Sequence, residues 1–259
     1  MPSSEGWRWV KHTGLATLLA FVSGYTDVVS IVRYRAFAAM QTGNTIWLGR
    51  VIGDDLPDDW NAPFYYAAIP MCFVAGAVLH QLLEKTHFPN RGASIAAVPL
   101  ASLMMVGEAV YFFTDYDWGN VLRWTVVAIA PLFGVLASAC SSGRLGTHTT
   151  MVTGHVLSLS NHVTTLLLKR SLPAQDRGKA VLSLCVILGT VLGALLGSYF
   201  VHRYNVRYLL FPVPPLLYCL LWLHDHLAKP RAIIKKVRRH IKGRYQEPHS
   251  PLGAYLCFC

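Results

Sequence analysis

The sequence predicts an all-α membrane protein, a polytopic bundle of transmembrane helices, and two observations carry that prediction. Of its 259 residues, 53% are hydrophobic and only 14% are charged, which leaves too little polar surface for an ordinary soluble domain. Six apolar stretches also come close to the roughly 20 residues that a helix needs to cross a hydrocarbon core about 30 Å thick. These stretches are residues 13–32, 64–83, 93–113, 123–140, 180–201 and 206–223.

Two shorter and more polar segments lie between these stretches, at residues 36–52 and 147–168. Each either crosses the membrane or enters and leaves it on the same side. Polar backbone at membrane depth is tolerated only where protein or water covers it. We therefore predict six full spans plus two short broken or re-entrant helices.

The charge pattern predicts the topology. The formal net charge is +10, and much of it falls in the tail, residues 226–259, after the transmembrane domain at 13–225. Basic residues close to a span favour the cytoplasmic side, so this tail and the N-terminal segment 1–12 are expected inside. The tail suits anionic lipid at the membrane surface, and we do not expect it to bind nucleic acid.

The side of the membrane on which the two acidic loops lie depends on whether the short segments 36–52 and 147–168 cross it. If neither crosses, the loops with Asp54 and Asp115 lie outside, and Arg33 at the outer end belongs to the protein interior. If both cross, those acidic loops are cytoplasmic. The ends of the chain are cytoplasmic in both arrangements.

Four of the six cysteines fall inside the expected spans, where small packing residues are the usual interpretation: Cys72, Cys140, Cys185 and Cys219. The chain ends with Cys257 and Cys259, and a terminal Cys-x-Cys leaves lipidation open.

A faint internal repeat divides the domain into halves at about 13–113 and 123–223. Thr42-Gly43 recurs as Thr153-Gly154, 111 positions later, and the apolar segment 74–79 resembles 191–196, 117 positions later. Three crossings in each half would make the second copy start from the opposite side, the inverted repeat common in secondary transporters. Four crossings would make the repeat parallel.

Two acidic residues lie inside expected spans. Asp27 and Glu108 each cost free energy at membrane depth unless they are paired or protonated. For Asp27 we favour a functional role, with Arg33, Arg144 or the Thr42 hydroxyl as candidate partners. For Glu108 we favour a structural hydrogen-bonding role, and proton coupling is open for both acids.

Backbone N–H groups at the Thr-Gly pairs would begin short helices, and helix N-termini attract anions. We therefore expect a central substrate site at the level of the two broken segments. Its candidate residues are Asp27, Thr42, Gly43, Asn44, Thr153, Gly154 and His155.

Three histidines, His148, His155 and His162, recur every seven residues and would form one stripe on a helix, about 10 Å apart along its axis. That separation is too large for one metal ion to join two of them. No catalytic motif stands in a suitable context, so we expect no catalytic residue, metal or cofactor. Gly189, Gly193 and Gly197 form one small face, which indicates close helix packing.

The segment Gly24-Tyr25-Thr26-Asp27, followed by Phe37 and by Met40-Gln41-Thr42-Gly43-Asn44, resembles the YoaK-type family of integral membrane proteins, the domain of unknown function 1275. The resemblance extends over roughly residues 13 to 225. It implies a multi-span helical bundle and, for most members, no established activity.

The sequence therefore favours a multi-pass transporter of a small solute, with an anionic solute and proton coupling as open options. A non-transporting membrane scaffold or assembly protein is the first alternative, and a histidine-dependent membrane enzyme is the second. The expected partners are the solute and the lipid bilayer. The identity of the solute, the coupling ion, the membrane and the oligomeric state are left open.

Overall fold

The structure, a computed structural model, describes residues 4–53, 62–113, 123–141, 145, 147–169, 171–204 and 206–227. Over these residues the chain is helical and contains no strand, which confirms the all-α prediction. The α-helices are α1 (Ser4–Tyr34), α2 (Gln41–Gly53), α3 (Ala62–Leu82), α4 (Gly92–Phe113), α6 (Thr125–Ser141), α7 (Val152–Lys169), α8 (Ala174–Arg203) and α9 (Val213–His226). Two single turns, η1 (Leu83–His87) and η2 (Val206–Tyr208), join them.

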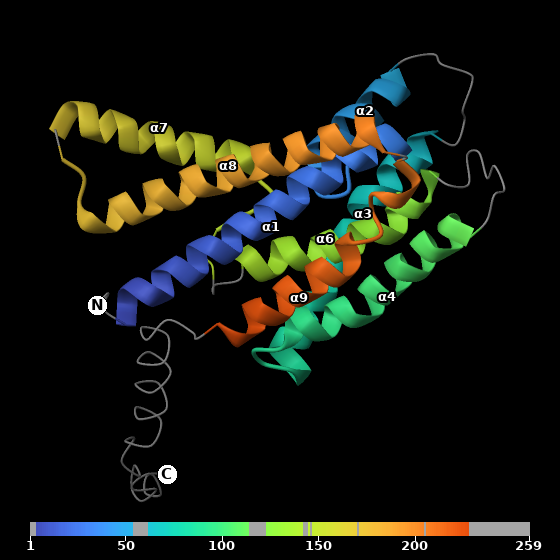
Figure 1. Ribbon diagram of the computed structural model, residues 1–259, viewed down its shortest axis with the longest axis horizontal. Coiled ribbons are helices and arrows are strands. Elements are labelled where there is room, and N and C mark those ends of the chain that lie inside the picture. The colour runs from blue at the N-terminus through green and yellow to red at the C-terminus, as the bar shows by residue number, and fades with distance from the viewer. Residues whose placement is uncertain are drawn as a thin grey trace, which may run out of the picture. The chain divides into compact units, whose positions relative to one another are not determined.

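Helices α1, α3, α4, α6, α8 and α9 run roughly along one common direction, and successive ones run in opposite senses (Figure 1). The beginnings of α1 and α4 and the end of α9 lie together, at what we call the N-terminal end of the bundle. Within the part of the chain that the structure describes, four helical segments are long and apolar enough to cross a membrane; they lie in α1, α3 with η1, α4 and α8. Among the described residues α6 is a shorter apolar helix, and α9 has only 14 residues.

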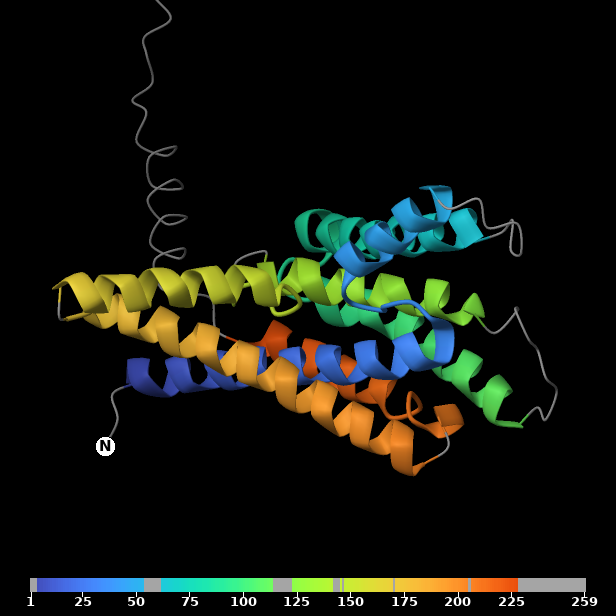
Figure 2. The same cartoon turned by 90° about the horizontal axis from the view of Figure 1, so that it is seen from above.

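The other two helices, α2 and α7, begin in the middle of the bundle and run outward to opposite ends (Figures 1 and 2). We call them the short helices because each begins in mid-bundle. The chain leaves α1 at Tyr34, and after six non-helical residues α2 begins at Gln41 and packs on α3. Likewise α7 begins at Val152 and packs on α8. The predicted segments 36–52 and 147–168 thus contain short helices that start several residues after the segments do.

The longest packing contacts join helices from different halves of the sequence. Helix α1 packs along α8, and α3 packs along α6. Glycines permit this closeness: a Cβ on Gly24 of α1 would collide with the carbonyl oxygen of Thr190 on α8. In the other pair, a Cβ on Gly134 of α6 would collide with the carbonyl oxygen of Phe73 on α3. Small residues let transmembrane backbones approach closely.

A second set of contacts joins the same two pairs of helices, with the glycine now on the other helix of each pair. A Cβ on Gly193 of α8 would collide with the carbonyl oxygen of Phe21 on α1, and one on Gly76 of α3 would collide with that of Pro131 on α6. Across both sets, corresponding residues of α1 and α6 are 110 positions apart, and those of α3 and α8 are 117 apart.

The face of Gly189, Gly193 and Gly197 lies against α1. A Cβ added at Gly189 or Gly197 would lie 2.7 or 3.0 Å from the carbonyl oxygens of Thr17 and Tyr25. The packing interpretation of these glycines is therefore confirmed.

The helix bounds differ from the apolar stretches chiefly at the ends of the chain. Helix α1 begins at Ser4, so part of the expected N-terminal segment 1–12 belongs to it. The compact unit ends at Leu227. The basic tail, Cys257, Cys259, Arg144 and the aspartates of the two acidic loops lie outside the described residues.

Candidate functional site

The carboxylate of Asp27 lies at the start of α2. Its Oδ1 accepts a hydrogen bond from the backbone N–H of Ala39 at 2.7 Å, and the neighbouring amides of Ala38 and Met40 also stabilise its charge. These amides immediately precede the first residue of α2. The N-terminus of a helix attracts a negative charge, and here a side chain from α1 supplies it.

Asn44, in the first turn of α2, fixes the chain that leads into the helix. Its Oδ1 accepts from the N–H of Phe37 at 2.9 Å, and its Nδ2 donates to the carbonyl of Phe37 at 2.7 Å and to Gln41 at 3.0 Å. The Nε2 of Gln41 donates to the carbonyl of Ala38 at 3.0 Å. A Cβ on Gly43 would collide with the ring of Phe37 at 2.5 Å, so the turn folds tightly on the helix.

His155 has the corresponding place in α7. Its Nε2 donates to the carbonyl of His148 at 2.9 Å, which leaves Nδ1 to accept from the hydroxyl of Ser183 at 3.1 Å. The Thr147 hydroxyl lies 3.1 Å from Nε2. Because His148 precedes α7, the expectation of a single helical stripe of three histidines is wrong; His155 and His162 alone share the helix.

The expected site residues divide into two kinds. Asn44 and His155 are buried, and each binds the turn that precedes its helix. In contrast, Thr42, Thr153 and Gly154 are exposed on the first turns of α2 and α7. A Cβ on Gly154 would meet nothing within 4 Å, so the start of α7 is open. The two short helices pack on different neighbours, α3 and α8.

The partner of Arg33 is Glu108 and not Asp27. Arg33 Nη1 lies 2.7 Å from Glu108 Oε2, and the two side chains are only 5% and 1% exposed. The hydroxyl of Tyr34 donates to Glu108 Oε1 at 3.3 Å. The sequence analysis considered Arg33 and Glu108 but did not pair them. An arginine and a glutamate that were both expected inside the protein were a usable signal.

A family model described as "Protein of unknown function (DUF1275)" matches residues 15–222, nearly the whole described bundle. The chain belongs to the DUF1275 family. This confirms the resemblance drawn from residues 24–27 and 40–44. No curated protein and no solved structure matches the chain.

The residues that carry the DUF1275 resemblance each have a defined place in the fold. Gly24 lets α1 approach α8, and the Tyr25 hydroxyl donates to the carbonyl of Leu209 at 2.8 Å. Thr26 donates to the carbonyl of Val22 in its own helix, also at 2.8 Å. Asp27 and Asn44 fix the start of α2, as described above. The motif thus builds the break between α1 and α2.

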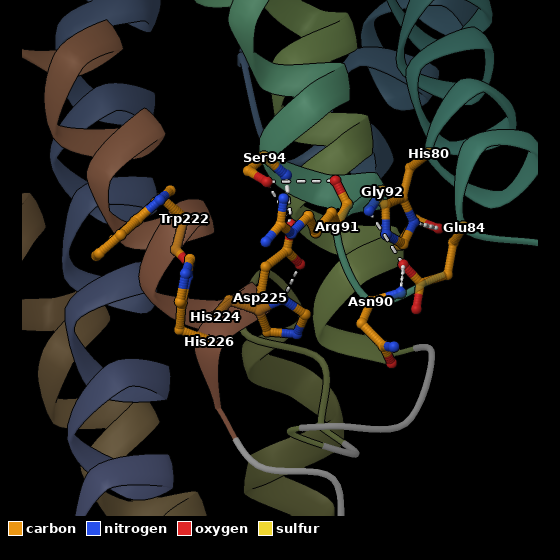
Figure 3. A network of polar contacts seen from close by, with 11 residues as sticks. His80, Glu84, Asn90, Arg91, Gly92, Ser94, Trp222, His224, Asp225 and His226 are labelled. Carbon is orange, nitrogen blue, oxygen red and sulfur yellow. Dashed lines mark hydrogen bonds and ion pairs between the residues drawn. The ribbon is translucent and has the colours of Figure 1, made fainter. Parts of the chain in front are cut away.

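A second polar network closes the N-terminal end of this DUF1275 bundle (Figure 3). The N–H and the hydroxyl of Ser94, at the start of α4, both donate to Oδ2 of Asp225 at 2.7 Å. His224 Nδ1 donates to the other oxygen of Asp225 at 3.2 Å. Both donors and the carboxylate are buried. Asp225 lies near the end of the last helix, and its partner Ser94 is 131 positions away in the sequence.

Glu84 completes the start of α4 from the side of η1. Its Oε2 accepts from the N–H groups of Asn90 and Gly92, each at 3.1 Å. Nearby, His80 Nδ1 lies 2.9 Å from the hydroxyl of Ser138 on α6. Within the described part of this DUF1275 protein, no group of three His, Cys, Asp or Glu side chains is placed to hold a metal ion.

Proposed function

We propose that this protein is a membrane transporter of a small solute, built from two inverted halves. The halves consist of α1 to α4 and α6 to α9, and each contains three crossing helices and one short re-entrant helix, α2 or α7. This gives six crossings in all. The observation that carries the proposal is that the two short helices begin in mid-bundle and point to opposite ends (Figures 1 and 2).

The glycine contacts support the inverted repeat. Gly24 meets Thr190 just as Gly134 meets Phe73, with helix separations of 110 and 117 positions. An approximate two-fold axis exchanges the two contacts, since each pairs the first helix of one half with the third element of the other. Any two-fold axis pairs helices reciprocally, so these contacts support two related halves. The inversion is supported by the opposite senses of α1 and α6 and of α2 and α7 (Figure 1).

The solute site in this proposal lies where the short helices begin. Thr42, Thr153 and Gly154 are exposed there, and exposed hydroxyls at membrane depth are better placed against water than against lipid. The start of α2 already holds the carboxylate of Asp27, whereas α7 has no acidic residue in its first turn. An anionic solute would therefore meet the start of α7.

In this proposal Asp27 couples solute transport to proton binding. When it is ionised, its carboxylate holds the Ala39 amide in place, and proton binding would weaken that charge-assisted bond. The start of α2 would then be free to move. Glu108 is the second candidate for proton coupling, and the proposal assigns no catalytic residue, metal or cofactor.

In this arrangement the N-terminal end of the bundle faces the cytoplasm. Both ends of the chain are then cytoplasmic, and the basic tail meets anionic lipid. The partners are the solute and the bilayer.

A non-transporting scaffold is the second candidate, and the pairing of Asn44 favours it. Its amide makes three hydrogen bonds within the chain, so it has little capacity left for a solute. In a scaffold, Asp27 would only join α1 to the start of α2.

Thermal unfolding of the purified protein with a panel of organic acids, inorganic anions, nucleobases and amino acids, at two pH values, separates these candidates. A ligand that binds only the folded protein raises the midpoint. The variants are Asp27→Asn and the control Asp176→Asn, which removes a carboxylate on α8 that pairs only with exposed Lys179 among the described residues.

A transporter predicts that at least one compound stabilises the wild type and Asp176→Asn, and that the effect is lost or changes its pH dependence in Asp27→Asn. If no compound stabilises any form and Asp27→Asn is merely less stable, the scaffold is the better description.

A further inference from the structure

Helix α4 is fastened to a distant part of the chain near each of its ends. Near its end, Glu108 binds Arg33 of α1, and near its start, Ser94 binds Asp225 of α9. In both cases the carboxylate is buried. The two attachments lie near opposite ends of α4, one beside the last turn of α1 and the other beside the last turn of α9 (Figure 1).

The attachment to α1 is made by side chains alone. Helix α1 packs chiefly on α8, whereas α4 packs chiefly on α9 and α6. The long Arg33 side chain therefore bridges two helices that have different main neighbours. A buried ion pair of this kind is strong only while its geometry holds, because each charge is costly once its partner leaves.

The Asp225 bonds to the start of α4 differ from the Glu84 bonds to the same end of the helix in how far apart their residues are in the sequence. Glu84 and Asp225 both bind backbone N–H groups at the start of α4 (Figure 3). Glu84 lies in η1, eight residues before Gly92, so its bonds to the N–H groups of Asn90 and Gly92 join residues that are close in the sequence. Asp225 lies 131 residues beyond Ser94, so its bonds hold two separate helices together.

Pro99 lies between the two attachments, inside α4. A proline within a helix removes one backbone hydrogen bond and kinks or weakens the helix at that point. The segment that Asp225 holds and the segment that Glu108 holds can therefore bend relative to each other about Pro99.

We propose that α4 is a hinged gate helix with two locks, the Arg33–Glu108 ion pair at one end of the bundle and the Ser94–Asp225 hydrogen bonds at the other. The proposal rests on the proposed transport function, to which it adds the moving part. Opening the first lock exposes the interior between α1 and α4 from one side, and opening the second exposes the interior between α4 and α9 from the other. Bending at Pro99 lets one lock open while the other stays closed.

Two buried serines can report the opening of each end. Ser30 lies one turn before Arg33 on α1 and is fully buried. Ser138 is 5% exposed and binds His80, which lies beside Glu84 at the other end (Figure 3). In a protein whose native cysteines are replaced, Ser30→Cys and Ser138→Cys would each react with N-ethylmaleimide only when their end opens.

The full-length protein in lipid nanodiscs carries either reporter, with Glu108→Gln, Asp225→Asn or the control Glu84→Gln. Glu108→Gln should raise the labelling rate of Ser30→Cys by about tenfold or more and leave Ser138→Cys unchanged, because local opening controls access to a buried thiol. Asp225→Asn should do the reverse. Glu84→Gln should change neither rate, since the bonds from Glu84 to Asn90 and Gly92 lie within the turn that leads into α4.

Equal acceleration of both reporters by any of the three variants would overturn the gate, because it indicates general loosening. No acceleration by Glu108→Gln or Asp225→Asn would also overturn it. If Glu108→Gln does not fold, the double variant Arg33→Gln/Glu108→Gln replaces it, since it removes both buried charges. The labelling experiment needs no solute. If it shows the expected opening while no compound raises the unfolding midpoint, the transport proposal is refuted and the gate is not.

Discussion

Asn44 on α2 and His155 on α7 each bind the backbone carbonyl of the residue seven positions earlier, Phe37 and His148, at 2.7 and 2.9 Å. The two residues are 111 positions apart, as are the carbonyls that they bind. An amide and an imidazole can replace each other here because both offer a donor and an acceptor. The turns before α2 and α7 are therefore held by equivalent hydrogen bonds, from an amide side chain in one case and an imidazole in the other.

The first prediction concerns these hydrogen bonds. Asn44→Ala should free the turn before α2, because three hydrogen bonds are lost and the partly buried backbone groups of Phe37 lose their partner, at a cost of about 1–3 kcal/mol for each group left unsatisfied. Hydrogen exchange should become faster at the Phe37 amide. Thr45→Ala, one position along on the exposed face, is the control and should leave that exchange unchanged.

The second prediction concerns the crossing of α1 and α8. Gly24→Ala should lower the free energy of unfolding by about 1–3 kcal/mol, the usual cost of overpacking, because the added Cβ meets backbone at Thr190 and not a movable side chain. Thermal unfolding measures the change.

Gly14→Ala on the same helix is the matched control. Its Cβ would meet nothing within 4 Å, so the higher helix propensity of alanine should make it neutral or stabilising by about 0.5–1 kcal/mol. Equal destabilisation by the two substitutions would show that the close crossing is not what Gly24 provides.

The third prediction concerns the buried ion pair. Arg33→Gln and Glu108→Gln should each destabilise the protein by about 3–5 kcal/mol, since each leaves the opposite charge without this ion pair in a buried position. The double variant should cost clearly less than the two single losses together.

Asp176→Asn and Lys179→Gln form the control pair. Their side chains are 36% and 58% exposed, and an exposed pair contributes only about 0–1 kcal/mol. Additive losses at Arg33 and Glu108 would contradict the assignment of a stabilising pair.

The fourth prediction concerns the short helices. If α2 and α7 are re-entrant, Gly53→Cys at the end of α2 and Ser171→Cys just after α7 lie on opposite sides of the membrane. A membrane-impermeant maleimide added to intact cells should then label Gly53→Cys and not Ser171→Cys. If both segments cross, the two positions lie on the same side, and they would be labelled alike.

Much of the fold is predictable from the sequence because its signals are local. Apolar stretches of spanning length located the longer helices, and the polar interruptions located α2 and α7 to within a few residues. Asp27 and Asn44 were identified as special because polar groups are costly in apolar surroundings. That cost shows that such a residue needs a partner, but not which one.

The partners themselves were found less well. We expected Arg33, Arg144 or Thr42 beside Asp27, and the Asp27 carboxylate instead binds backbone N–H groups, which every residue of that turn carries. Asp225 was missed because its partner Ser94 is 131 positions away. His148 was placed on α7 because its spacing fits a helix, but the helix begins only at Val152.

By itself, the sequence determined the all-α class with apolar helices of spanning length, the positions of the two breaks, the small glycine face on α8 and the family, since all of these depend on the order of residues along the chain. Only the tertiary structure decided that α1 packs on α8 and α3 on α6, and that Glu108 and Asp225 fasten α4 near its two ends. The physical reason is that periodicity fixes which face of a helix is apolar or small, but many helices offer such a face. The choice among them depends on the shape and charge of surfaces that meet only when the whole bundle has formed.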